Sequence, residues 1–136
     1  EQLGYKPIMK ANIINKNFSI KKSLSSLKFK CIQVRHGQIN SSCFVFNKIA
    51  YVSDCNQIPK KSYKYLKNLN YLVVDCLQVK KHPSHFNLEE ALKLSVELKP
   101  KKTILTNLHI TLDYEKLKKT LPKNVLPAFD GMNFNF

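Results

Sequence analysis

The sequence predicts a layered αβ fold of the α+β class, in which helices flank a mixed β-sheet. Short apolar runs of strand length alternate along the chain with segments of helical periodicity. The composition is 43% hydrophobic and 24% charged, which is ordinary for a globular protein. With 136 residues, the chain is at most one domain.

Seven segments are expected to be β-strands. A weak strand lies near residues 12–15, and the last strand follows a turn at Asp130-Gly131, within 128–136. A tight hairpin is expected to turn at Asn47-Lys48. Alternating or continuous apolar residues predict the other strands at 27–35, 43–46, 49–52, 71–74 and 103–108.

Three segments are expected to be helices. Pro59 suits the first turn of a helix. Asn87 is a predicted N-cap, and Glu90, three residues later, completes a capping box. Asp113 is expected to cap the last helix. The three helices are expected at 62–69, 88–98 and 114–121.

The chain is strongly basic, with a net charge of +14 from 23 basic and 9 acidic residues. All the basic residues except Arg35 are lysines, and they are spread along the whole chain. Nucleic-acid sites favour Arg forks and regularly spaced aromatic residues. We therefore interpret the surplus chiefly as a solvated surface, with binding of nucleic acid or another polyanion as the alternative.

The sequence carries no sign of export or membrane insertion. No apolar run approaches the roughly 20 residues of a membrane helix, and the N-terminus lacks the layout of a signal peptide. The first residue is Glu1 rather than Met, so we expect a truncated or processed piece. The four cysteines are far apart, which predicts free thiols in a reducing cytoplasm.

The candidate functional residues lie at or just after the ends of predicted strands, where αβ folds usually build their sites. Imidazole and carboxylate groups together suit Zn, Mn or Fe. Each candidate also has a structural alternative, such as ending a strand, capping a helix or bonding to the backbone. The candidates are His36, Asp54, Asp75, His82, His85, Asn107 and His109.

A series of short motifs follows in a fixed order through the chain. They are Tyr51–Asp54, Ile58-Pro59, Leu72–Asp75, His82–Phe86, Leu105–His109, Leu112–Tyr114 and Ala128–Met132. As a set they resemble the C-terminal half of the metallo-β-lactamase-fold hydrolases. The run His-Pro-Ser-His-Phe resembles the cyclic-phosphate phosphodiesterase branch of the phosphonate-pathway type. The resemblance covers residues 30–136, whereas residues 1–29 match poorly.

The resemblance implies part of an αββα sandwich with a two-metal site, holding Zn or Mn, between its two sheets. In this family the two metals clamp a phosphate and activate water. Carried over to this chain, it implies that His36, Asp54 and His109 are metal ligands, with Asp54 bridging both metals. It gives His85 the catalytic role of general acid, beside the catalytic carboxylate of Asp54.

The remaining candidates are expected to support this site. Asp75, His82 and Asn107 are predicted to orient the ligands or to contact substrate. The family commonly has Thr-His where this sequence has Thr106-Asn107. His109 lies two positions further on, and two residues along a strand share a face. Either Asn107 or His109 is therefore the candidate for the last ligand position.

The family's main metal motif, His-x-His-x-Asp-His, does not occur in this sequence. We therefore expect a metal-dependent phosphodiesterase for a cyclic or small phosphodiester that is inactive as an isolated chain. Half of a sandwich exposes an apolar face, so we also expect a missing N-terminal half or self-association to cover it. The alternative is a non-catalytic remnant, or a basic binding module without hydrolase activity.

Overall fold

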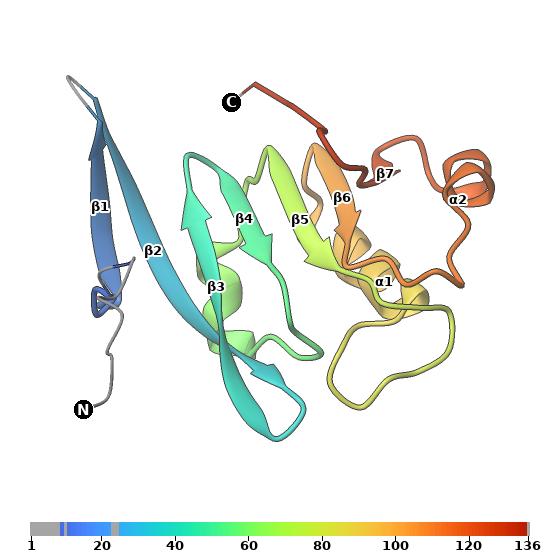
Figure 1. Ribbon diagram of the computed structural model, residues 1–136, viewed down its shortest axis with the longest axis horizontal. Coiled ribbons are helices and arrows are strands. Elements are labelled where there is room, and N and C mark those ends of the chain that lie inside the picture. Colours follow the sequence, from blue (N-terminus) through green and yellow to red (C-terminus); the bar gives the residue numbers. More distant parts are fainter. Residues whose placement is uncertain (1–8, 10, 23–24, 136) are drawn as a thin grey trace, which may run out of the picture.

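The strands of this protein lie side by side in chain order, from β1 at one edge of a seven-stranded sheet to β7 at the other (Figure 1). The computed structural model describes residues 9, 11–22 and 25–135. The strands are β1 Asn17–Lys22, β2 Ser25–His36, β3 Ile39–Phe46, β4 Ile49–Val52, β5 Tyr71–Asp75, β6 Lys102–Thr106 and β7 Val125–Pro127. The helical segments are the 3-10 helix η1 Lys60–Tyr65 and the α-helices α1 Leu88–Leu98 and α2 Tyr114–Thr120.

The sheet is mixed, as the sequence predicts. Strands β1 to β4 pair as an antiparallel meander, and β4 to β7 pair in parallel. The β3–β4 hairpin turns at Asn47 and Lys48, whose φ angles of 42° and 61° suit a tight two-residue turn. Because β2 is antiparallel to β3, it runs in the same direction as β4, β5 and β6. The carboxyl ends of these four strands therefore reach one edge of the sheet (Figure 1).

One face of the sheet carries the hydrophobic core. Figure 1 shows η1 and α1 together on this face. The expected capping box of α1 is confirmed, because the Glu90 backbone N donates to Asn87 Oδ1 at 2.8 Å and the Asn87 backbone N donates to Glu90 Oε2 at 3.1 Å. The core side chains include Ile32, Val34, Cys43, Ala50, Val52, Leu66, Leu72, Val74, Ala91, Leu94 and Leu105.

The opposite face carries a row of aromatic side chains, which we call the aromatic face. Phe18 stacks on Phe29 with ring centroids 4.9 Å apart, and Phe29 contacts Phe46 at 4.8 Å. Phe44 pairs in register with Tyr51, which is 42% exposed. Within the described residues, neither η1 nor α1 covers this face (Figure 1). The aromatic face is therefore apolar and only partly buried.

Several predicted elements are corrected by the structure. No strand forms at 12–15, since the first strand is β1, which is fixed by its pairing with β2 rather than by its own sequence pattern. The expected helix at 62–69 is the shorter 3-10 helix η1. The strand predicted at 103–108 stops at Thr106, because Asn107 adopts a left-handed backbone with φ 59°. The strand expected within 128–136 is absent from the described residues of that range, and the last strand is β7.

Among the described residues, no helix has the length and apolar character needed to cross a membrane. The four cysteines are free thiols in the structure.

Candidate metal centre

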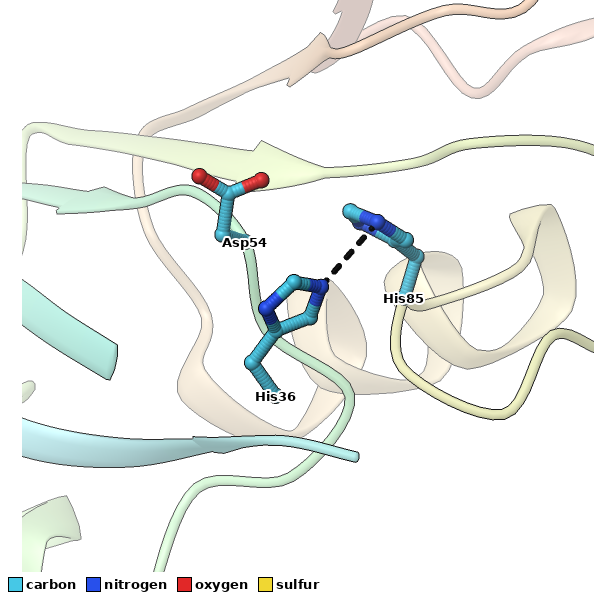
Figure 2. A group of neighbouring side chains, drawn as sticks. All are labelled: His36, Asp54 and His85. Atoms are coloured by element: carbon cyan, nitrogen blue, oxygen red, sulfur yellow. Dashed lines mark hydrogen bonds between the residues drawn. The ribbon is translucent and has the colours of Figure 1, made fainter. Parts of the chain in front are cut away.

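Three of the predicted site residues meet at the carboxyl edge of the sheet. His36, Asp54 and His85 each offer one ligand atom, and these atoms all lie within 4.8 Å of one another. Figure 2 shows the three side chains directed toward a common point. His36 is the last residue of β2, Asp54 follows β4, and His85 lies in the loop between β5 and α1. Separate segments of the chain thus converge on one group.

The backbone at Asp54 is unusual for a residue that carries a side chain. Its φ angle is 49°, in the left-handed region that Asp and Asn tolerate better than most residues. Such a conformation persists only where the surrounding structure holds it. The turn directs the chain sharply away from the end of β4 at the point where the carboxylate is presented.

His85 is held from behind by Asp75. The two side chains form a short bond of 2.6 Å between His85 Nδ1 and Asp75 Oδ2, and Asp75 is fully buried. Because a carboxylate accepts, the proton of this bond lies on Nδ1, which leaves Nε2 directed at the group. Asp75 Oδ2 also accepts from the Cys55 backbone N at 2.9 Å. A buried carboxylate that fixes the ring of a histidine is a common support for metal ligands and acid–base groups.

The spacing of the two histidines fits a metal. His36 Nε2 lies 3.2 Å from His85 Nε2, as the dashed line in Figure 2 marks. Tetrahedral zinc with bonds of about 2.1 Å places two ligand nitrogens about 3.4 Å apart. Two imidazoles and one carboxylate are also donors that Zn and Mn accept. The residues present therefore fit a divalent metal, with three donors from this chain.

A small network fixes the loop of His85 against the end of β2. The Gly37 backbone N donates to Asn56 Oδ1 at 2.9 Å, and Asn56 Nδ2 donates to the Pro83 carbonyl at 3.1 Å. Gly37 has φ +60°, and a Cβ atom there would lie 3.2 Å from the Ser84 Cβ. A glycine is therefore needed both for its backbone and for the close approach. This contact sets the separation of His36 and His85.

Asn107 lies next to the carboxylate of Asp54. Its Nδ2 donates to Asp54 Oδ1 at 3.4 Å and to Ser53 Oγ at 3.2 Å. The family pattern has a histidine at this position, whereas this chain presents an amide nitrogen, which is a donor and not a metal ligand. The geometry is that of a group that orients Asp54.

His109 and His82 lie around this group rather than in it. His109 is exposed, and its Nδ1 contacts Thr111 Oγ1 at 3.1 Å. It is not one of the three grouped ligands, because β6 ends before it and the two-residue periodicity of a strand no longer applies. The His82 ring lies 5.1 Å from the His85 ring, and its Nδ1 accepts from the Ser84 backbone N at 3.3 Å. The ligand role of His109 stays a prediction.

The nearby thiols of Cys55 and Cys76 are not among the grouped ligands. Burial raises the pKa of Cys55 to about 12, and burial likewise raises the pKa of Cys76 to about 12. Cys55 Sγ donates to the Gln57 carbonyl at 3.5 Å, and both cysteines are core side chains.

The sequence did not single out Gly37 or Asn56. The sequence offered one signal for Gly37, which is its position directly after the candidate ligand His36. No pattern in the sequence marks Asn56, because its bonds to Gly37 and Pro83 join segments that are distant along the chain.

A mixed sheet with helices on one face and a His–Asp–His group at the carboxyl ends of its strands is the arrangement that the resemblance to metallo-β-lactamase-fold proteins implies. Residues 1–110 match the Beta-lactamase superfamily domain, and the chain belongs to this family.

Known structures agree with this assignment. The chain is similar to a diphosphatase from the PhnP family, with 30% identity and a TM-score of 0.80 over 87% of this chain and 46% of that one. It shares the fold of the protein YhfI from Bacillus subtilis, with 16% identity and a TM-score of 0.72 over 96% of this chain and 58% of that one.

A curated relative matches a similar part of the chain. An octanoyltransferase from Porphyromonas gingivalis (strain ATCC BAA-308 / W83) is 24% identical over 112 residues, which are 80% of this chain and 23% of that protein. The chain thus spans a quarter or less of this relative and about half of the diphosphatase.

Proposed function

We propose that this chain supplies one half of the active site of a metal-dependent phosphodiesterase that acts on a cyclic or other small phosphodiester. The observation that carries the proposal is the group of His36, Asp54 and His85, with ligand atoms within 4.8 Å of one another. The similarity to a PhnP-family diphosphatase, at 30% identity, supports a phosphate ester or anhydride as the substrate class.

The residues of the group take distinct roles in this proposal. In the chain alone, His36, Asp54 and His85 together would hold a divalent cation, Zn or Mn. Such a metal polarises the phosphoryl group and supplies a nucleophile at neutral pH. In the completed site, the ligands from outside the chain would replace His85 at the metal, and its Nε2 would then contact phosphate and give a proton to the leaving oxygen. Asp75 holds the ring of His85 in place through the 2.6 Å bond to Nδ1.

Two other residues complete the neighbourhood of the site. Asn107 fixes the orientation of Asp54 through its amide. His82, whose ring lies 5.1 Å from that of His85, lines the approach to the site. His109 is a ligand only if the segment after Asn107 rearranges, since its ring contacts Thr111.

The remaining ligands and the second wall come from outside the chain in this proposal. The chain covers 46% of the diphosphatase, and its aromatic face lacks a helical cover within the described residues. A second sheet from an upstream polypeptide, or from a second copy, would bury this face.

A chimera tests the proposal. This chain would replace the matching half of the PhnP-family diphosphatase, and hydrolysis of bis(p-nitrophenyl) phosphate and of a cyclic phosphodiester would be measured with Mn or Zn. We expect turnover by the chimera, none by the chain alone, and loss of turnover in the Asp54→Asn and His85→Gln chimeras. A folded, metal-loaded chimera without activity on either ester would overturn the proposal.

A further inference from the structure

The chain that follows β7 leaves the sheet and turns back. Among the described residues, the last backbone bond from this part of the chain to β6 runs from the Ala128 N to the Leu105 carbonyl, at 2.8 Å. Gly131, with φ +85°, then turns the chain. Figure 1 shows the chain returning from β7 toward the start of β5. Residues 132–135, which we call the return segment, therefore lie outside the ladder of the sheet.

The return segment lies on the aromatic face. The Phe134 ring stacks on the Tyr71 ring with centroids 4.4 Å apart, and the Tyr71 hydroxyl donates to the Asn135 carbonyl at 3.3 Å. Tyr71 pairs in register with Ile49, and Ile49 pairs with Phe46 of the aromatic face. Register partners share one face of a sheet. The segment is thus placed on the face that η1 and α1 leave open.

The return segment has the side-chain pattern of a β-strand without a neighbouring strand. Met132 and Phe134 are half-buried, whereas Asn133 and Asn135 are exposed, which is the two-residue period of a strand. Within the described part of the chain, none of the backbone N–H groups of residues 133–135 has a hydrogen-bond partner. The apolar side chains therefore contact the sheet while the backbone stays open for pairing.

The position of the segment places it in a second layer. A segment that packs on the face of a sheet lies about 10 Å from it, which is the spacing of the second sheet in a sandwich. The unpaired N–H and C=O groups of a lone strand are a template for another strand. Water satisfies these groups while they are exposed, but a sheet that covers the aromatic face would remove this water, so the groups would then need partners.

The charge of the chain favours a partner other than a second copy. The net charge is +14, and residues 2–53, which include β1 to β4, contain no Asp or Glu. Two copies placed face to face would bring these uncompensated charges together. The chain also spans only 46% of the PhnP-family diphosphatase, so the other half of such a domain is a distinct polypeptide segment.

We propose that the return segment is a strand of the second sheet, and that the other half of the metallo-β-lactamase domain docks by adding a strand to it while it covers the aromatic face. Met132 and Phe134 then lie between two sheets. The inference rests on the proposed second half of the site, but it concerns how that half docks rather than the metal or the substrate. The strand expected within 128–136 is unpaired here because the described residues offer no neighbouring strand in that layer.

Backbone hydrogen exchange tests the docking, measured on this chain and on its chimera with the diphosphatase half. We expect the amides of residues 133–135 to exchange at nearly the unstructured rate in the chain. At least one of them should exchange about 100-fold more slowly in the folded chimera. Protection of these amides already in the isolated chain, or their absence of protection in the folded chimera, would overturn the proposal.

This measurement separates the docking from the proposed activity, because it needs neither metal nor turnover. An active chimera with unprotected amides would overturn the docking alone. A folded chimera that protects the amides but hydrolyses neither ester would support the docking and overturn the phosphodiesterase. If the fusion does not fold, the chain is co-expressed with the diphosphatase half as a separate polypeptide, and failure of the two to form a complex would overturn the docking.

A pair of Phe variants tests the anchor of the segment. In the chimera, Phe134→Ala removes the ring that stacks on Tyr71, and we expect the protected amides to exchange about tenfold faster. Phe129→Ala is the matched control, because its ring is 53% exposed and contacts Tyr114 instead. The control should leave the exchange within about twofold of the parent chimera. Equal effects of the two substitutions would overturn the role of Phe134 as the anchor of a second-layer strand.

Discussion

The histidine group and a groove along β2 are two polar regions of one sheet, built by opposite means. The groove is lined by Lys16, Lys30, Lys61 and Lys64, and we call it the lysine groove. His36, Asp54 and His85 are held by short bonds, a buried carboxylate and a left-handed backbone. The groove is made of long side chains without carboxylate partners among the described residues. Function at the first region should therefore depend on exact position and be insensitive to salt, whereas function at the second should follow charge and be sensitive to salt.

The cysteines are expected to differ in their reactivity toward a thiol reagent, and this difference is the largest effect that we predict. Cys31 lines the lysine groove and is half-buried, whereas Cys43, Cys55 and Cys76 are buried. Burial raises the pKa of Cys76 from 9.0 to about 12, so its thiolate fraction falls about a thousandfold. We expect Ellman's reagent at pH 8 to label one thiol rapidly, and a Cys31→Ser variant to lose this phase.

The same pKa values predict a loss of stability at alkaline pH. A buried thiol stays protonated in the folded state up to pH values where the unfolded thiol has already ionised. The free energy of unfolding is unaffected by the thiols below about pH 9. As the pH rises from 9 toward 12, it falls by about 1.4 kcal/mol per pH unit for each buried thiol. Urea denaturation between pH 7 and 10 measures this, and a flat profile would contradict the buried state of these residues.

Asp75 tests whether the histidine group depends on exact side-chain positions, because it supports the group without being one of its three grouped ligands. Asp75→Asn replaces the acceptor of the His85 Nδ1 proton, and we expect metal affinity to fall about 10–100-fold. Isothermal titration with Zn or Mn measures the change. Asp130→Asn, on an exposed turn, is the matched control and should bind metal like the parent. An unaltered affinity in Asp75→Asn would show that the 2.6 Å bond does not orient the ring.

Asn107 offers a gain rather than a loss. An imidazole in place of the amide beside Asp54 adds a fourth donor to the group. We expect Asn107→His to tighten Zn or Mn binding about tenfold. His109→Ala should leave affinity unchanged, because that ring contacts Thr111 instead. The reverse pattern, a loss in His109→Ala, would assign the last ligand position to His109.

Replacing the two glycines with positive φ by Ala is expected to give the smallest effect, and Gly131 serves as the control for Gly37. Gly37 and Gly131 both lose about 1 kcal/mol of stability on substitution by Ala, since φ is +60° and +85°. Only at Gly37 would the new Cβ lie 3.2 Å from another side chain, whereas nothing lies within 4 Å at Gly131. We expect Gly37→Ala to lose about 1 kcal/mol more, and also to weaken metal binding. Equal losses, measured by urea denaturation, would dismiss the close approach as a determinant of the site.

Much of the fold could be predicted from local patterns. The capping box at Asn87 and Glu90, the Asp113 cap and the hairpin turn at Asn47 depend on neighbouring residues, so the sequence contains them directly. Strand β1 could not be predicted in the same way, because it is defined by pairing with β2. The end of β6 was misplaced for a related reason, since Asn107 leaves the strand conformation.

The site was predictable where order along the chain was enough. The motifs of Asp54 and His85 follow the family order, and the fold brings these two residues together with His36, whereas His109 lies outside the group. The contact between Asn107 and Asp54, and the network of Gly37 with Asn56, join segments far apart in sequence and depend on backbone angles that no pattern encodes. The lysine groove likewise arises from spatial neighbours, whereas the sequence shows only a dispersed surplus of lysine.

The central claim is that His36, Asp54 and His85 together bind one divalent cation. Isothermal titration of the folded chain with Mn or Zn, beside the His36→Gln variant, tests it most directly. We predict one site per chain whose affinity is reduced at least about 100-fold in His36→Gln and is insensitive to replacement of Lys61 and Lys64 by Gln. Equal binding by the parent chain and the variant, or no binding by either, would contradict the claim.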